Sequence, residues 1–140
     1  MDTTFTLPVT ASHSLRRALR ADGLFSGIGG ILSIILAQPL AVLTGLRPPA
    51  VLVILGVGLL GYAALLLWTT ARPPIDRRLA ITAIVLNEVW VLASVAILLS
   101  GWPPLTTAGK WLIGLVAIVV ADFSLWQFIA LRRLNRSNLL

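Results

Sequence analysis

Four long apolar stretches follow one another along the chain, separated by short polar connections. They cover approximately residues 23–45, 50–70, 79–100 and 108–131. Each could cross a bilayer as a helix, since the roughly 30 Å hydrocarbon core requires about 20 residues at 1.5 Å per residue. Each connection holds a proline pair, which ends the preceding helix. Because short connections place successive helices in opposite directions, the pattern predicts an all-α integral membrane protein, an antiparallel up-down bundle of four transmembrane helices.

The composition agrees with this interpretation. Of the 140 residues, 58% are hydrophobic and 11% are charged, whereas a soluble domain has about 25% charged residues. This balance argues against a soluble enzyme, a nucleic-acid-binding domain and a disordered tail. The chain has no Cys, and its single His is His13 near the N-terminus, so it lacks thiol nucleophiles and the usual soft metal ligands. We therefore expect no enzyme, no catalytic residue, no metal and no cofactor.

Basic residues are distributed unequally between the two sides of the predicted bundle. Of the eleven, only Arg47 and Lys110 fall on one side, and the other nine fall on the side of the two termini and the middle connection. By the positive-inside rule, that side faces the cytoplasm. We therefore predict a cytoplasmic N-terminal segment over 1–21, a transmembrane domain over 22–133 and a cytoplasmic tail over 134–140.

The N-terminal segment carries a second pattern. Within residues 12–21, Leu15 and Leu19 are one helical turn apart among three arginines, which predicts a short basic helix on the inner membrane surface. Asp22 is expected to cap the first transmembrane helix, beside Arg20. Basic residues at this surface attract anionic lipid. We therefore interpret the formal charge of +6 as favouring contact with the lipid bilayer and not binding of nucleic acid.

Small residues in two of the spans are spaced for close helix packing. They are Gly23, Gly27 and Gly30 in the first span and Gly114, Ala117 and Ala121 in the fourth. Helices in a bilayer associate through close backbone approach and buried hydrogen bonds. The spacing is compatible both with contacts inside one bundle and with contacts between subunits. Since four helices enclose little interior, we expect a homo-oligomer or a subunit of a larger membrane complex.

Two carboxyl groups lie within the predicted spans. Glu88 is ten residues from Arg78, and Asp122 is ten residues from Arg132. Each would lie about 15 Å from the inner interface, near the midplane of the bilayer. Ionisable groups are unfavourable at this depth and are therefore candidates for a functional site. We expect the two carboxyl groups to face each other across the third and fourth helices.

Further side chains belong to the same predicted layer. Tyr62, Asn87 and Trp90 lie at a similar depth, with Trp90 packed inside the bundle. Because burial and like-charge repulsion both disfavour the charged form, at least one carboxyl group should bind a proton at neutral pH. The layer is then either interhelical hydrogen-bond glue, contributing about 0.6–2 kcal/mol per bond, or a proton-linked or ligand-binding site.

Four short segments carry a family likeness: Leu86–Ser94 (LNEVWVLAS), Pro104–Gly109 (PLTTAG), Ala121–Gln127 (ADFSLWQ) and Leu131–Arg133 (LRR). With them the chain resembles a loose group of small four-helix bacterial inner-membrane proteins. The resemblance covers most of the chain and implies a multi-pass protein of the bacterial inner membrane, but no particular activity. We therefore expect a structural, accessory or interaction subunit that acts through helix–helix contacts. The alternative is a proton-linked small transporter or ligand-binding bundle that uses Glu88 and Asp122.

Overall fold

The computed structural model describes residues 9–72 and 74–137, and this part of the chain is helical without strands. The helices are α1 (Val9–Ile35), α2 (Ala37–Thr44), α3 (Ala50–Ala71), α4 (Arg77–Ser100) and α5 (Thr107–Ser137). Each of the four long helices contains a segment that is long and apolar enough to cross a membrane. The four predicted apolar spans are therefore confirmed as helices, as in a multi-pass membrane protein.

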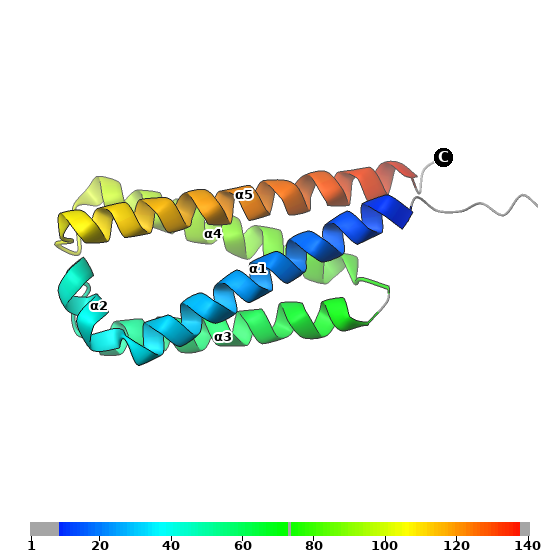
Figure 1. Ribbon diagram of the computed structural model, residues 1–140. Helices are drawn as coiled ribbons and strands as arrows, with labels where there is room; N and C mark the ends of the chain where they lie inside the picture. Colours follow the sequence, from blue (N-terminus) through cyan, green and yellow to red (C-terminus); the bar gives the residue numbers. More distant parts are fainter. Residues whose placement is uncertain (1–8, 73, 138–140) are drawn as a thin grey trace, which may run out of the picture.

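Helix α1 lies between α3 and α5 and packs against both of them, and α4 packs against α5. In Figure 1, α1 and α4 run from right to left along the chain, whereas α3 and α5 run from left to right. The first turn of α1 and the last turn of α5 lie at the same end of the molecule (Figure 1). We call this the terminal end.

Helix α1 begins earlier than the sequence pattern indicates. Residues 12–21, expected as a separate surface helix, continue into the first span as part of one helix, while residues 1–8 lie outside the described chain. Leu15 and Leu19 are each 1% exposed and belong to the hydrophobic core. The segment is therefore part of the bundle, because its apolar positions form one helical face that packs against α3, α4 and α5.

Two arginines of this segment reach the C-terminal end of α3. Arg16 Nη1 donates to the carbonyl oxygen of Thr70 at 2.5 Å, and Arg20 Nη2 donates to the same oxygen at 3.3 Å. The last carbonyls of a helix have no intrahelical partner and carry partial negative charge, so a cation stabilises them. These arginines thus join α1 to α3, in addition to any effect on membrane orientation.

The first span is interrupted at Leu36, between α1 and α2. Pro39 explains the position, because proline has no amide hydrogen and its ring clashes with the carbonyl four residues earlier, here that of Ile35. Helix α2 turns away from α1 (Figure 1) and packs against the start of α5, where the amide of Thr106 donates to the Thr44 carbonyl at 3.0 Å. The proline pairs lie in the three connections between spans, with Pro73 outside the described residues.

The glycine stripe of α1 faces α3. A Cβ atom at Gly30 would lie 2.8 Å from the carbonyl oxygen of Gly56, and one at Gly56 would lie 2.7 Å from that of Gly30. A Cβ at Gly23 would meet the side chain of Leu66, and one at Gly27 would contact Ala63. The absence of side chains lets the two backbones approach this closely. The predicted packing role of these glycines is therefore filled within the chain.

The small residues of the fourth span have looser surroundings. Ala117 is buried and Ala121 is partly buried, and a Cβ at Gly114 would be 4.0 Å from the Leu98 side chain of α4. The tightest approach of α5 is at Gly109, where a Cβ would lie 2.2 Å from the carbonyl oxygen of Thr44. Gly109 therefore permits the contact between α5 and α2.

Candidate functional site

A cluster of four polar side chains lies inside the bundle, with one member from each long helix: Asp22 of α1, Tyr62 of α3, Asn87 of α4 and Gln127 of α5. We call it the Asp22 cluster. One oxygen, Oδ2 of Asp22, accepts hydrogen bonds from the Tyr62 hydroxyl at 2.8 Å, the Asn87 amide at 2.8 Å and the Gln127 amide at 2.7 Å. Asp22 and Gln127 are both 0% exposed. All four long helices thus meet at a single carboxylate oxygen.

Additional contacts complete the Asp22 cluster. The hydroxyl of Ser26 donates to the other carboxylate oxygen of Asp22 at 3.4 Å, and the Asn87 amide nitrogen also lies 3.5 Å from Oε1 of Gln127. The Tyr62 oxygen lies 3.2 Å from Oδ1 of Asn87, farther than from Asp22. A carboxylate is an acceptor only, and the surrounding hydroxyl and amide groups all offer it hydrogens. The geometry therefore fits a carboxylate that acts as the shared acceptor of uncharged donors.

The charge of Asp22 has no basic partner. Among residues 12–72 and 74–137, no arginine or lysine lies within ion-pair distance of its carboxylate. Arg20, two residues away in the chain, donates instead to the Thr70 carbonyl of α3. Within the described chain, the carboxylate is instead held by uncharged hydrogen-bond donors from three other helices. This is the chemical property that distinguishes the Asp22 cluster from an ordinary interhelical hydrogen bond.

The position of Asp22 follows from the periodicity of α1. Asp22 occupies the same helical face as Leu15 and Leu19, at positions i, i+4 and i+7, and all three are buried. The expectation that Asp22 caps the first helix is wrong, because α1 begins at Val9, thirteen residues earlier. In α5, Gln127 lies on a buried face with Ser124 in the same way. This spacing is the signal that could have identified both residues.

The structure does not bring Glu88 and Asp122 together in the interior. Both residues are exposed. Glu88 Oε1 accepts a hydrogen bond from the Ser124 hydroxyl of α5 at 2.5 Å. Consecutive residues of a helix differ by 100° in direction, and it is Asn87, not Glu88, that faces the bundle centre at 5% exposure. Tyr62 and Asn87 of the predicted layer therefore meet around Asp22, without either predicted carboxylate.

Trp90 is partly buried on α4 and stands apart from the Asp22 cluster. Its backbone carbonyl accepts from the Ser94 hydroxyl at 2.8 Å. Its indole N–H is buried and has no hydrogen-bond partner among the described residues. Trp90 is therefore a packing residue in this structure.

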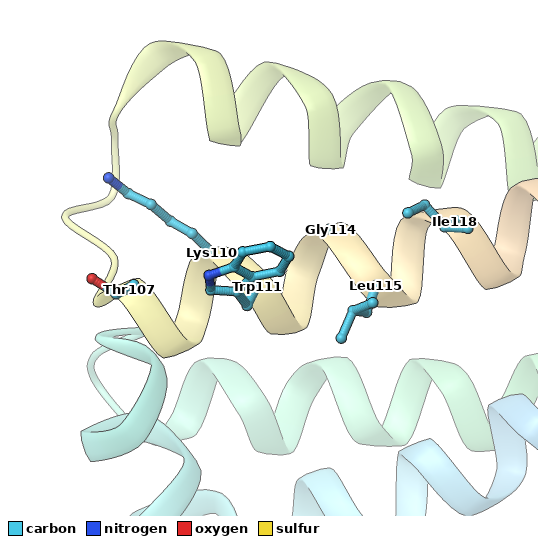
Figure 2. A pocket seen from close by; sticks show the side chains of 6 residues that line it. All are labelled: Thr107, Lys110, Trp111, Gly114, Leu115 and Ile118. Carbon is cyan, nitrogen blue, oxygen red and sulfur yellow. The ribbon is translucent and has the colours of Figure 1, made fainter.

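Asp122 lies on an outward surface of α5 that is otherwise apolar. We call this the α5 outer face, formed by Trp111, Leu115, Ile118, Asp122 and Leu125. Its apolar members are 55–69% exposed. Figure 2 shows side chains of the first half of this face, among them Trp111, Leu115 and Ile118. These residues line a hollow of about 320 Å³. Asp122 follows Ile118 by one helical turn, so its carboxylate continues the same face toward the middle of the helix.

No protein-family model, curated protein or solved structure matches this chain. What the protein does must therefore be inferred from its own residues. The two features that require explanation are a fully buried carboxylate that meets no cation among the described residues and an exposed carboxylate on an apolar helix face.

Proposed function

We propose that the protein is a multi-pass protein of the bacterial inner membrane that acts as a structural, accessory or interaction subunit. It works through contacts of its helices with those of a second copy or of a larger membrane complex, without enzymatic activity or a cofactor. The four spans form an antiparallel up-down bundle with both termini in the cytoplasm. The excess of arginine at the terminal end supports this orientation.

The position of Asp122 carries the proposal. Asp122 is ten residues from Arg132 and therefore about 15 Å deeper along α5, at the midpoint of this helix and on the exposed α5 outer face. An aspartate at the centre of a transmembrane helix is unfavourable by about 2.5–3.5 kcal/mol on insertion scales. Contact with a helix that donates a hydrogen bond removes that penalty. A carboxylate here is therefore better explained by a protein neighbour than by lipid alone.

Photo-crosslinking in native membranes tests this proposal. Benzoylphenylalanine replaces Ile118 on the α5 outer face or, as a control, Val57 on α3. The two side chains are 61% and 59% exposed, and they lie fourteen and fifteen residues from Arg132 and Arg72. We expect a discrete protein adduct from position 118 and only lipid adducts from position 57. An adduct of twice the chain mass identifies a second copy, and any other mass identifies another subunit.

The variant Asp122→Asn measures the contribution of the carboxylate. If it accepts a hydrogen bond from the neighbour, the yield of the position-118 adduct should fall on the order of tenfold, because an intramembrane hydrogen bond contributes about 1–2 kcal/mol. Asp76→Asn, in the connection between α3 and α4, is the matched control and should leave the yield unchanged. Only lipid adducts at both positions would refute an interaction through this face.

The Asp22 cluster favours a second candidate function, a proton-linked small transporter or ligand-binding bundle. Such a protein requires an ionisable group in its interior, and Asp22 is one: it is fully buried and has no basic partner among the described residues. Glu88 and Asp122 no longer support this candidate as a facing pair, since both are exposed. The second candidate function therefore depends on Asp22, whereas the sequence indicated Glu88 and Asp122.

Proteoliposomes that enclose a pH-sensitive dye test this candidate. Under an imposed pH gradient, the second candidate function predicts a proton flux that Asp22→Asn abolishes and Asp122→Asn preserves. Helix content and size-exclusion profile of Asp22→Asn show whether the fold is retained. A flux equal to that of empty liposomes, or one that Asp22→Asn leaves unchanged, would eliminate proton linkage through Asp22.

A further inference from the structure

A groove of about 420 Å³ lies between α4 and α5 near the terminal end. Three polar and several apolar side chains line the groove, among them Arg77, Ile81, Val85, Phe128, Arg132 and Asn135. The two kinds of residue are separated along the groove. Arg77 begins α4, and Val85 lies eight residues further, about 12 Å deeper. The groove is thus cationic at the end of the helices and apolar toward their middle.

The cationic part of the groove is held in place and is not neutralised. The Arg132 guanidinium carbon lies 5.2 Å from the centre of the Phe128 ring, a cation–π contact that directs the charge over the apolar part. Neither Arg77 nor Arg132 forms an ion pair within the described chain. The two carboxylates of α4 and its N-cap do not line the groove, and both have other partners. Asp76 accepts from the backbone amide of Arg78, and Glu88 accepts from Ser124.

We propose that this groove binds one anionic phospholipid. The phosphate group lies between the guanidinium groups of Arg77 and Arg132, with Asn135 as a further donor, and an acyl chain lies against Ile81, Val85 and Phe128. A free phosphate would use only the cationic end, whereas a phospholipid matches the charged and apolar parts at once. The site rests on the proposed insertion of the protein in a membrane, and it goes beyond the attraction of lipid to basic residues in general.

Lipid association of the full-length protein in reconstituted vesicles tests the site. The probes are spin-labelled phosphatidylglycerol and spin-labelled phosphatidylcholine with identical acyl chains, and the measured quantity is the ratio of their association constants. We expect Arg77→Gln/Arg132→Gln to reduce the preference for phosphatidylglycerol by about 25-fold, since each of the two basic residues near the membrane surface contributes about fivefold. Arg78→Gln/Arg133→Gln should retain most of the preference.

The two double variants are matched, because each removes one charge from the start of α4 and one from the end of α5. The second pair does not line the groove. Equal losses of the preference for phosphatidylglycerol in both variants would overturn the site, because overall positive charge would then account for the preference. A third variant, Val85→Trp, should weaken association of both lipids by filling the apolar part, and millimolar inorganic phosphate should not compete. Competition by phosphate would indicate an anion site without a lipid.

Reconstitution itself separates this site from the proposed function. Protease protection of the connections reports whether the four helices cross the bilayer, independently of lipid preference. Crossing with no preference for phosphatidylglycerol contradicts the lipid site alone. Failure to cross contradicts the proposed function, and the lipid site with it.

Discussion

Replacement of Asp22 by alanine is expected to lower the free energy of unfolding by about 2–6 kcal/mol, because three interhelical hydrogen bonds of about 0.6–2 kcal/mol each are lost. The change leaves the hydroxyl of Tyr62 and the amides of Asn87 and Gln127 without their shared acceptor. Unfolding in mixed micelles of increasing SDS fraction, followed by far-UV circular dichroism, measures the difference.

Two further variants serve as controls for the effect of Asp22→Ala on stability. Asp22→Asn keeps one acceptor oxygen at the same place and should lose less stability than Asp22→Ala. Asp122→Ala removes an exposed carboxylate and should change the unfolding curve of the isolated protein by less than about 0.5 kcal/mol. If Asp22→Ala unfolds at the same SDS fraction as Asp122→Ala, the Asp22 cluster does not hold the helices together.

Replacement of Gly56 by valine is expected to destabilise the protein by about 1–3 kcal/mol through overpacking between α1 and α3. The first added carbon would lie 2.7 Å from the carbonyl oxygen of Gly30, and backbone cannot yield as a flexible side chain does. The same SDS unfolding experiment measures this change, and disulfide trapping between cysteines placed on α1 and α3 measures their separation.

Gly58 is the matched control for this substitution. It lies two residues further along α3, and a Cβ atom at Gly58 would have nothing within 4 Å. Gly58→Val has the same change in helix propensity without the steric conflict. The difference between the two variants therefore isolates the α1–α3 contact, and equal stability of the two would contradict the close backbone approach.

The four spans could be predicted from the sequence because each exceeds the length needed to cross a bilayer and contains few charges. The start of the first span could not be placed in the same way. Arg16, Arg17 and Arg20 were interpreted as marking the membrane edge, whereas the helical face of Leu15 and Leu19 indicates burial. Hydropathy is averaged over all sides of a helix. Several arginines therefore lower the mean hydropathy of this segment even though one of its faces is apolar and buried.

Depth along a helix was easier to infer than rotation about its axis. Tyr62 and Asn87 share one level, as their spacing from Arg72 and Arg78 predicts, and both belong to the Asp22 cluster. Glu88 is adjacent to Asn87 in the chain but points to the exterior, since neighbouring residues differ in direction by 100°. Gln127 is five residues from Arg132, half the distance that defines the predicted layer, so depth along α5 alone does not place it beside Asn87. The rotation of α4 follows from its packing against α5 and from the hydrogen bonds of Asn87 to Asp22 and Tyr62, which no single-helix pattern contains.

The order in which the chain is synthesised gives the Asp22 cluster a consequence for biogenesis. Asp22 precedes Asn87 by 65 residues and Gln127 by 105 residues. Helix α1 therefore leaves the ribosome before Asn87 and Gln127, two of the three donors, are synthesised. Until then, the Asp22 carboxylate lies in an environment that differs from its final one. Final packing of α1 requires α5, the last helix to be synthesised. The mature arrangement of the helices can therefore form only when translation is nearly complete.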